Sequence, residues 1–187
     1  KDGINMITKG GSNSDTIFGA SGNDVIRGKQ GNDTVKGGSG NDIIYSNKGS
    51  DILYGGLGTD QLRGGLGLDT YVFPNSELED GITDVIHELQ KGEKIGLSSG
   101  IKWRKINATD DTAAPTTLTD SEVESYIQKI SGNYTLVIEK QADGSQKSFV
   151  NLGENRPFEP LKWTPEGQGD SIQYLTVVDN TSPELEV

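Results

Sequence analysis

The sequence predicts a mainly β protein, in which a right-handed parallel β-roll with 18 residues per coil precedes an α+β or β capping region. Three observations predict it. A nine-residue repeat runs through the first part of the chain, residues 1–73 hold 17 of the 26 glycines, and glutamate is confined to the remainder. This glycine content excludes an ordinary helical bundle. The change in composition near Phe73 predicts two domains: residues 1–73 form the roll, and residues 74–187 form the cap.

The repeat consists of seven consecutive units of nine residues, from Gly10 to Val72. Position 4 is glycine in every unit except the first, where it is Asn13. Position 6 is always aspartate: Asp15, Asp24, Asp33, Asp42, Asp51, Asp60 and Asp69. Position 8 is always large and apolar: Ile17, Ile26, Val35, Ile44, Leu53, Leu62 and Tyr71. Residues 1–9 read as a decayed eighth unit with Met6 in the aspartate position. A fixed period of this kind is the signature of a solenoid.

Each unit divides into a glycine-rich turn of six residues and a strand of three. Glycine allows the positive φ angles and the close backbone approach that such a turn needs. Within the strand, position 8 points to the opposite side from positions 7 and 9, so it faces inward and builds a thin apolar stack. Two units make one coil with a sheet on each side, which places unit n beside unit n+2 at about 4.8 Å.

This stacking gathers like charges into two columns, with the odd-numbered aspartates on one edge and Asp24, Asp42 and Asp60 on the other. Carboxylates at this spacing repel by about 1 kcal/mol per pair in water, and by several times more at an effective dielectric constant near 20. The repeated repulsion predicts cations between the coils. Carboxylates and turn carbonyls are hard oxygen ligands, which favour Ca²⁺ over Zn²⁺ and over the strictly octahedral Mg²⁺. If turns n and n+2 share each ion, about five interior sites result.

The composition excludes several other partners. The chain carries 28 acidic and 17 basic residues, a net charge of −11, which argues against nucleic acid and anionic membranes and favours cations. No apolar run approaches the roughly 20 residues of a membrane span, and no cleavable secretion signal is visible. Without cysteine and with His87 as the single histidine, a thiolate or histidine-built metal site is out of reach.

The unit GGSGNDIIY at residues 37–45 and its neighbours resemble the nonapeptide of RTX (repeats-in-toxin) proteins. The resemblance implies a Ca²⁺-loaded β-roll, type I secretion from a Gram-negative bacterium and an extracellular location. It also implies that the position-6 aspartates and the turn carbonyls are the ligands. The carbonyls at positions 2 and 4 are those of Gly11, Asn13, Ala20, Gly22, Lys29, Gly31, Gly38, Gly40, Asn47, Gly49, Gly56 and Gly58.

Short strands bury too little apolar area to offset the entropy of ordering, so the ion-free repeats are expected to be disordered. Ca²⁺ binding would then be coupled to folding, at the roughly 10⁻⁴–10⁻³ M typical of extracellular modules. We therefore expect a monomeric Ca²⁺-binding module that crosses the secretion machinery unfolded and folds outside the cell, as part of a larger protein. Residues 184–187 are similar to the end of a type I secretion signal.

Residues 65–73 followed by residues 82–99 resemble the exit from the roll in serralysin C-terminal domains and alginate epimerase R-modules. Gly96 stands where that family often has an acid, and Asp84, Asp80 and Glu79 are candidates for an ion site in the cap. Farther on, Thr119–Glu122 is a capping box before apolar residues at helical spacing, Val123, Tyr126, Ile127 and Ile130, which predict a helix. Residues 134–140 and 147–152 read as a hairpin, and residues 172–178 as a last strand.

An enzyme is not expected, because His87 would have to serve any serine–histidine–acid triad and no catalytic motif is present. A binding role is the alternative. The units whose strands form one sheet carry Arg27, Tyr45 and Arg63 at position 9, so these residues are expected to lie one strand apart. These residues form either a structural cation–π ladder or a strip that binds an anionic polysaccharide, as an accessory module of a polysaccharide-modifying enzyme or an adhesin.

Overall fold

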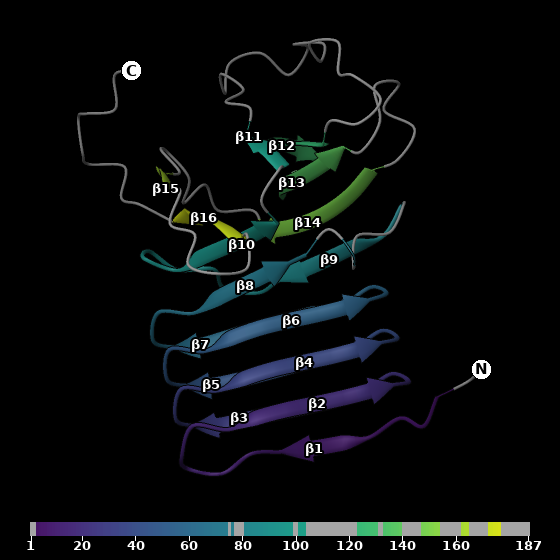
Figure 1. The fold of residues 1–187 in the computed structure, drawn as a ribbon, viewed down its shortest axis with the longest axis vertical. Coiled ribbons are helices and arrows are strands. Elements are labelled where there is room, and N and C mark those ends of the chain that lie inside the picture. Colours follow the sequence, from purple (N-terminus) through teal and green to yellow (C-terminus); the bar gives the residue numbers. More distant parts are fainter. Residues whose placement is uncertain are drawn as a thin grey trace.

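The structure is a computed structural model that describes residues 3–74, 76, 81–98, 101–103, 123–130, 133–139, 147–153, 162–164 and 172–176. Strands stack in two sheets from β1 at the N-terminal end toward the cap (Figure 1). One sheet of the roll holds β1 (Ile7–Lys9), β3 (Val25–Gln30), β5 (Ile43–Lys48), β7 (Gln61–Leu66) and β9 (Thr83–Ile86). The other holds β2 (Thr16–Ser21), β4 (Thr34–Ser39), β6 (Ile52–Leu57), β8 (Thr70–Phe73) and β10 (Lys94–Ser98).

The predicted pairing of unit n with unit n+2 is confirmed. All strands within the roll pair in parallel, and within the repeats each residue faces the one 18 positions later, as in Ile17 opposite Val35 and Ile26 opposite Ile44. The decayed first unit follows the same rule, because Ile7 of β1 pairs with Val25 of β3. The chain therefore alternates between the two sheets at every turn, which makes a parallel β-solenoid with 18 residues per coil.

The strands of the repeats are longer than the three residues that the sequence predicted. β2 to β7 each have six residues, so each includes positions 1 to 3 of the following unit. Position 2 bends the chain through a positive φ, which is 95° at Ala20, 85° at Lys29 and 79° at Asn47. The longer strands arise because the neighbouring coil offers backbone partners at positions 2 and 3 as well, as in Ala20 opposite Gly38.

The core of the roll is the predicted stack of position-8 side chains. They are between 0 and 6 % exposed: Ile17, Ile26, Val35, Ile44, Leu53, Leu62 and Tyr71. Ile86 and Ile95 continue the stack beyond the repeats, and Leu136 and Val150 of the cap belong to the same buried cluster. One hydrophobic core thus runs from the first coil into the cap.

The cap extends both sheets past the last coil. β14 (Lys147–Gly153) pairs with β9 and is followed in the sheet by β13 (Asn133–Glu139), β12 (Val123–Ile130) and β11 (Ile101–Trp103). On the other side β16 (Ile172–Thr176) pairs with β10, and β15 (Lys162–Thr164) pairs with β16. The cap strands therefore cover the edges that the last coil leaves open, which prevents edge-to-edge pairing there.

The predicted hairpin is confirmed by β13 and β14, and the predicted last strand by β16. The predicted helix is wrong, because residues 123–130 form β12 and pair antiparallel with β13 over seven register positions. Valine, isoleucine and tyrosine favour a strand as soon as a neighbouring strand offers backbone partners, and this tertiary pairing overrides the helical spacing. The capping box at residues 119–122 lies outside the described residues.

Candidate cation-binding edges

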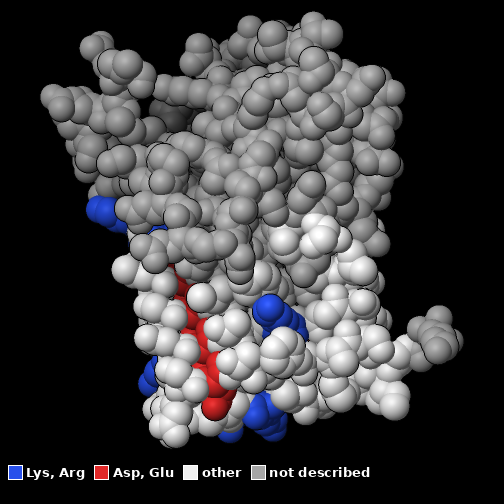
Figure 2. Space-filling model, in the orientation of Figure 1, with Lys and Arg blue, Asp and Glu red and all other residues white. Residues whose placement is uncertain are grey.

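Two ladders of aspartates run along the edges of the roll, and each ladder is linked by backbone hydrogen bonds. Asp15 N–H donates to Asp33 Oδ1 at 2.8 Å, and Asp24 N–H donates to Asp42 Oδ1 at 2.7 Å. The pattern repeats from Asp33 to Asp51, from Asp51 to Asp69 and from Asp42 to Asp60, at 2.7 to 2.9 Å. Figure 2 shows acidic atoms aligned along one side of the roll. The sequence-predicted columns of like charge are therefore brought together as expected.

Two further acids extend these columns beyond the repeats. Asp60 N–H donates to Asp84 Oδ1 at 2.9 Å. Asp84 therefore occupies the next place on the edge that carries Asp24, Asp42 and Asp60, the even edge; the edge that carries the other repeat aspartates is the odd edge. At the end of the odd edge a fully buried glutamate, Glu93, lies beside Asp69. Sequence reasoning named Asp84 as a candidate but missed Glu93, while Asp80 and Glu79 lie outside the described residues. An acid directly before an apolar-centred strand, as Glu93 stands before β10, is the signal that identifies it.

On both edges there are aspartates whose second carboxylate oxygen, Oδ2, lacks a hydrogen-bond partner. This holds for the Oδ2 atoms of Asp24, Asp33, Asp42, Asp51 and Asp69, all of which are buried. A buried carboxylate oxygen without a donor is costly, because the charge loses its hydration and gains nothing in return. At the open first coil, by contrast, Asp15 Oδ2 accepts a hydrogen bond from Gly11 N–H at 2.6 Å. The interior of each column thus lacks a positive partner.

Burial perturbs the ionisation of these carboxyls. Desolvation raises the pKa of Asp33, Asp42 and Asp51 above the usual range, and the charge of the neighbouring aspartate adds to the rise. The backbone N–H from the preceding coil lowers each pKa, but by less. Desolvation likewise raises the pKa of Asp69. A bound cation has the opposite effect, since it favours the charged form.

The glycines at position 1 allow the Oδ2 atoms without a hydrogen-bond partner to lie close to the backbone. A Cβ atom added to Gly37 would lie 2.3 Å from Asp42 Oδ2 and 2.4 Å from the Gly55 carbonyl oxygen. One added to Gly19 would lie 2.5 Å from Asp24 Oδ2 and 2.2 Å from the Gly37 carbonyl oxygen. At Gly19 and Gly37 the absence of a Cβ therefore allows the aspartate and the carbonyl of the next coil to approach this closely.

The turn carbonyls named from the resemblance point from coil to coil. A Cβ added at position 2 of Gly38 would lie 2.0 Å from the Ala20 oxygen, and one at position 4 of Gly40 would lie 2.2 Å from the Gly22 oxygen. Gly49, Gly56 and Gly58 show the same relation to Gly31, Gly38 and Gly40. Each edge therefore carries carbonyl oxygens as well as carboxylates.

A second ladder, at position 5, was not anticipated from the sequence. Asn23 N–H donates to Asn5 Oδ1 at 2.8 Å, and Asn41 N–H donates to Asn23 Oδ1 at 2.8 Å. On the odd edge, Ser50 N–H donates to Asn32 Oδ1 at 2.9 Å. These bonds run in the opposite direction to those of the aspartates, because here the later coil donates to a side chain of the earlier one. Neutral and charged side chains thus tie every coil to both neighbours.

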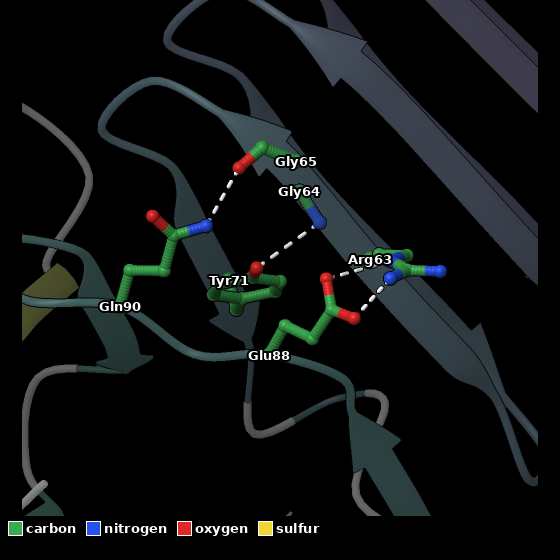
Figure 3. A network of polar contacts seen from close by, with 6 residues as sticks. All are labelled: Arg63, Gly64, Gly65, Tyr71, Glu88 and Gln90. Carbon is green, nitrogen blue, oxygen red and sulfur yellow. Dashed lines mark hydrogen bonds and ion pairs between the residues drawn. The ribbon is translucent and has the colours of Figure 1, made fainter.

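The outer face of the sheet that contains β3, β5 and β7 carries the predicted basic and aromatic strip. The register places Arg27 opposite Tyr45 and Tyr45 opposite Arg63. The guanidinium carbon of Arg27 lies 5.3 Å from the centroid of the Tyr45 ring, which is a cation–π contact. Arg63 forms an ion pair with Glu88 (Figure 3). The other sheet holds a similar contact, with Lys36 Nζ 4.7 Å from the Tyr54 ring.

The donor set fits a hard divalent cation. Orphaned carboxylate oxygens and backbone carbonyls lie at each interior turn, which is the ligand chemistry that Ca²⁺ prefers. Among the residues that the structure describes, no three acidic, histidine or cysteine side chains converge on one point. An ion on an edge therefore needs ligands besides acidic side chains, and the backbone oxygens of the turns are such ligands.

The fold and these edges define a parallel β-roll of the metal-binding kind. Residues 9–44 and 36–71 match the family model for the RTX calcium-binding nonapeptide repeat, which spans four copies. The repeats of this chain are accordingly RTX repeats, and they form a calcium-binding β-roll. No curated protein matches the chain. Within the described part of the chain, no helix has the length and apolar character needed to cross a membrane.

Proposed function

We propose that the chain is a calcium-dependent folding module of a larger secreted protein. Calcium binding itself follows from the RTX repeats. The observation that carries the proposal is the set of buried Oδ2 atoms along both edges that have no hydrogen-bond partner. A chain that repeats this cost at successive interior turns gains stability when cations supply the missing positive charge.

The aspartates of neighbouring coils are the proposed carboxylate ligands. Each interior ion is shared by two of them: Asp15 and Asp33, Asp33 and Asp51, Asp51 and Asp69, Asp24 and Asp42, and Asp42 and Asp60. The carbonyls at positions 2 and 4 complete the five sites. Bound Ca²⁺ supplies positive charge, while the chain itself supplies the spacing through its backbone hydrogen bonds from coil to coil.

Coupling to secretion follows from where calcium is found. Proteins with RTX repeats are typically secreted, and extracellular calcium modules bind in the range of about 10⁻⁴–10⁻³ M. In the bacterial cytosol such sites stay empty, so we propose that the chain leaves a Gram-negative cell unfolded through a type I system. Outside the cell the roll folds, acts as a monomer and stabilises the protein to which it belongs.

The repeat roll is a structural module, and we propose that this chain performs no catalysis itself. The single histidine, His87, is exposed and follows β9. We also propose the division into residues 1–73 and residues 74–187, although both sheets continue across this boundary through β9 and β10. The cap then covers the end of the roll, as the terminal units of solenoids do.

A calcium titration followed by far-UV circular dichroism tests the proposal, with Mg²⁺ as the control. The expected result is a steep gain of β signal with Ca²⁺ and little change with Mg²⁺. A β signal that is already complete in chelator and does not respond to Ca²⁺ contradicts coupled folding. Elemental analysis after equilibrium dialysis then counts the ions bound by each chain.

A second candidate function is the binding of an anionic polysaccharide by Arg27, Tyr45 and Arg63. The observation in its favour is a surface cavity of about 120 Å³ between Tyr45, Arg63 and His87. The ion pair of Arg63 with Glu88 argues for the structural ladder instead. Loss of alginate binding in the Arg27→Ala/Arg63→Ala variant, with calcium uptake unchanged, supports this second function. Absence of alginate binding in the wild-type protein removes it.

A further inference from the structure

Three departures from the repeat meet at the last coil, on the odd edge. Ser46 replaces the glycine that every other unit has at position 1, and Tyr71 replaces the aliphatic residue at position 8. Glu93 lies outside the repeats altogether. All three side chains are fully buried. Their convergence indicates a site that differs from the interior turns.

Glu93 and Asp69 each contribute a carboxylate oxygen without a partner. Both residues are 0 % exposed. Glu93 Oε2 accepts a hydrogen bond from Gln90 N–H at 2.6 Å, whereas no donor reaches Glu93 Oε1 or Asp69 Oδ2. The remaining contact of the two carboxyls is with each other, within hydrogen-bonding range. The two carboxyls lie beside each other, and each perturbs the ionisation of the other. This is the only place in the described part of the chain where a glutamate adds an orphaned oxygen to an aspartate column.

Backbone and side-chain contacts fix the segment that carries Glu93, and none of them requires an ion. Gln90 Nε2 donates to the Gly65 carbonyl at 2.8 Å (Figure 3), while the exposed ion pair of Glu88 with Arg63 adds little to this attachment. Lys94 N–H donates to the Asp69 carbonyl at 2.9 Å. The loop between β9 and β10 is thereby held on β7 and β8, so the Glu93 carboxylate is positioned before any ligand arrives.

Neutral oxygens lie close to the Asp69 carboxylate. Gly64 N–H donates to the Tyr71 hydroxyl at 3.1 Å (Figure 3), and Ser46 Oγ donates to the Gly64 carbonyl at 2.9 Å. A Cβ added to Gly64 would lie 2.0 Å from Asp69 Oδ2 and 2.7 Å from the Tyr71 hydroxyl, so the carboxylate and the hydroxyl approach the same point. Carboxylate, hydroxyl and carbonyl oxygens thus gather here, with no nitrogen or sulfur ligand among these residues.

We propose that Asp69 and Glu93 bind one additional Ca²⁺ at the junction of roll and cap, beyond the ions shared by the repeats. The proposal rests on calcium binding by the RTX repeats and adds a site that Glu93 completes. A single proton shared by the two carboxyls leaves one buried negative charge, whereas a divalent ion neutralises both. Because Glu93 directly precedes β10, the ion links the loop between β9 and β10 to the last repeat.

The test compares Glu93→Gln with Glu88→Gln, which removes a charge from the same segment but leaves both buried carboxylates intact. Ca²⁺ per chain is counted by equilibrium dialysis and elemental analysis at saturating calcium. We expect Glu93→Gln to bind one ion fewer than wild type and Glu88→Gln to bind the same number. An equal count in wild type and Glu93→Gln overturns the proposal and assigns Glu93 to a proton-sharing pair. If the wild-type chain takes up no Ca²⁺ at all, the proposed function itself fails.

Hydrogen exchange locates the effect. In the wild type, the amides of residues 88–98 should gain protection with Ca²⁺, and Glu93→Gln should lose that gain while β2 to β5 keep theirs. Protection of residues 88–98 in Glu93→Gln that matches the wild type contradicts the proposal. Should Glu93→Gln fail to fold, Glu93→Asp decides: a weakened affinity for one ion supports the site, and unchanged affinities for all ions overturn it.

Discussion

Asp42→Asn changes charge at the centre of the even edge while leaving the hydrogen bonds in place. The asparagine oxygen still accepts from Asp24 N–H, which lies 2.7 Å from Asp42 Oδ1, and the Asp42 N–H still donates to Asp60 at 2.8 Å. The substitution therefore removes one negative charge and little else. Under the proposed sharing, Asp42 belongs to two calcium sites, so both are weakened together.

The expected loss can be worked out from mass action. With free Ca²⁺ at about 100 times the dissociation constant, each site adds about 2.7 kcal/mol to the free energy of unfolding. Loss of two sites then lowers this free energy by about 5 kcal/mol. With a urea m-value of about 2 kcal/mol/M, the unfolding midpoint falls by about 2.5 M. Urea unfolding in saturating Ca²⁺, followed by circular dichroism, measures this shift.

In chelator, Asp42→Asn should have the opposite effect on the stability of the roll. Burial raises the pKa of Asp42, so the metal-free roll is destabilised by the charge that asparagine lacks. Asp42→Asn should consequently retain more β signal than wild type in chelator at neutral pH. The exposed Glu88→Gln serves as the control and should shift the midpoint little in either condition. Equal destabilisation of Asp42→Asn with and without Ca²⁺ would refute the reasoning, since the effect would then be independent of metal.

Three further predictions concern the backbone and pH. Gly37→Ala should weaken calcium-dependent folding by about 2 kcal/mol, because its Cβ would lie 2.3 Å from Asp42 Oδ2. The control Gly11→Ala should have no such effect, because its Cβ would lie 3.5 Å from its nearest neighbour. Equal midpoints of the calcium titration for the two variants contradict this prediction. Lys29→Gly should raise the free energy of unfolding in Ca²⁺ by about 1 kcal/mol, because Lys29 has a φ of 85°, which is strained for any residue with a side chain. Urea unfolding measures this gain, and the control Lys48→Gly should not show it. In chelator, the roll should fold better at about pH 3 than at pH 7. Folded-state pKa values above the unfolded ones add stability below the unfolded pKa, and this stability is lost as the pH rises through the folded pKa. A β signal in chelator that grows with pH contradicts this sign.

The register of the roll was predictable because a fixed period determines which residues become neighbours. Once two units make a coil, Asp33 must lie between Asp15 and Asp51, and Ile26 must stack beside Ile44. No knowledge of the cap enters this inference. The six-residue strands were missed since a positive φ at non-glycine residues such as Ala20 marks a bend inside a strand, which the sequence pattern presents as a turn.

Glu93 could not be found from the period, which ends at Val72. Its place depends on β10 pairing with β8, where Lys94 faces Thr70 and Ile95 faces Tyr71. Glu93 then precedes β10 as Asp69 precedes β8. The error at residues 123–130 has a related cause, because the strand exists only through its pairing with β13. Both features depend on contacts between segments that share no repeat.

Positions 5 and 6 of the repeat divide two tasks between a neutral and a charged side chain. Asn5, Asn23 and Asn41 accept hydrogen bonds from the following coil, while the aspartates accept from the preceding one. Because both ladders join coils 18 residues apart, the register is already specified by hydrogen bonds that need no metal. Under the proposed function, calcium therefore neutralises the carboxylates and does not select the pairing. On the odd edge the neutral ladder ends at Leu68, whose N–H donates to Ser50 Oγ but whose side chain offers no acceptor to a further coil. The cap begins where that ladder stops, and there the hydrogen bonds of Gln90 and Glu93 replace it.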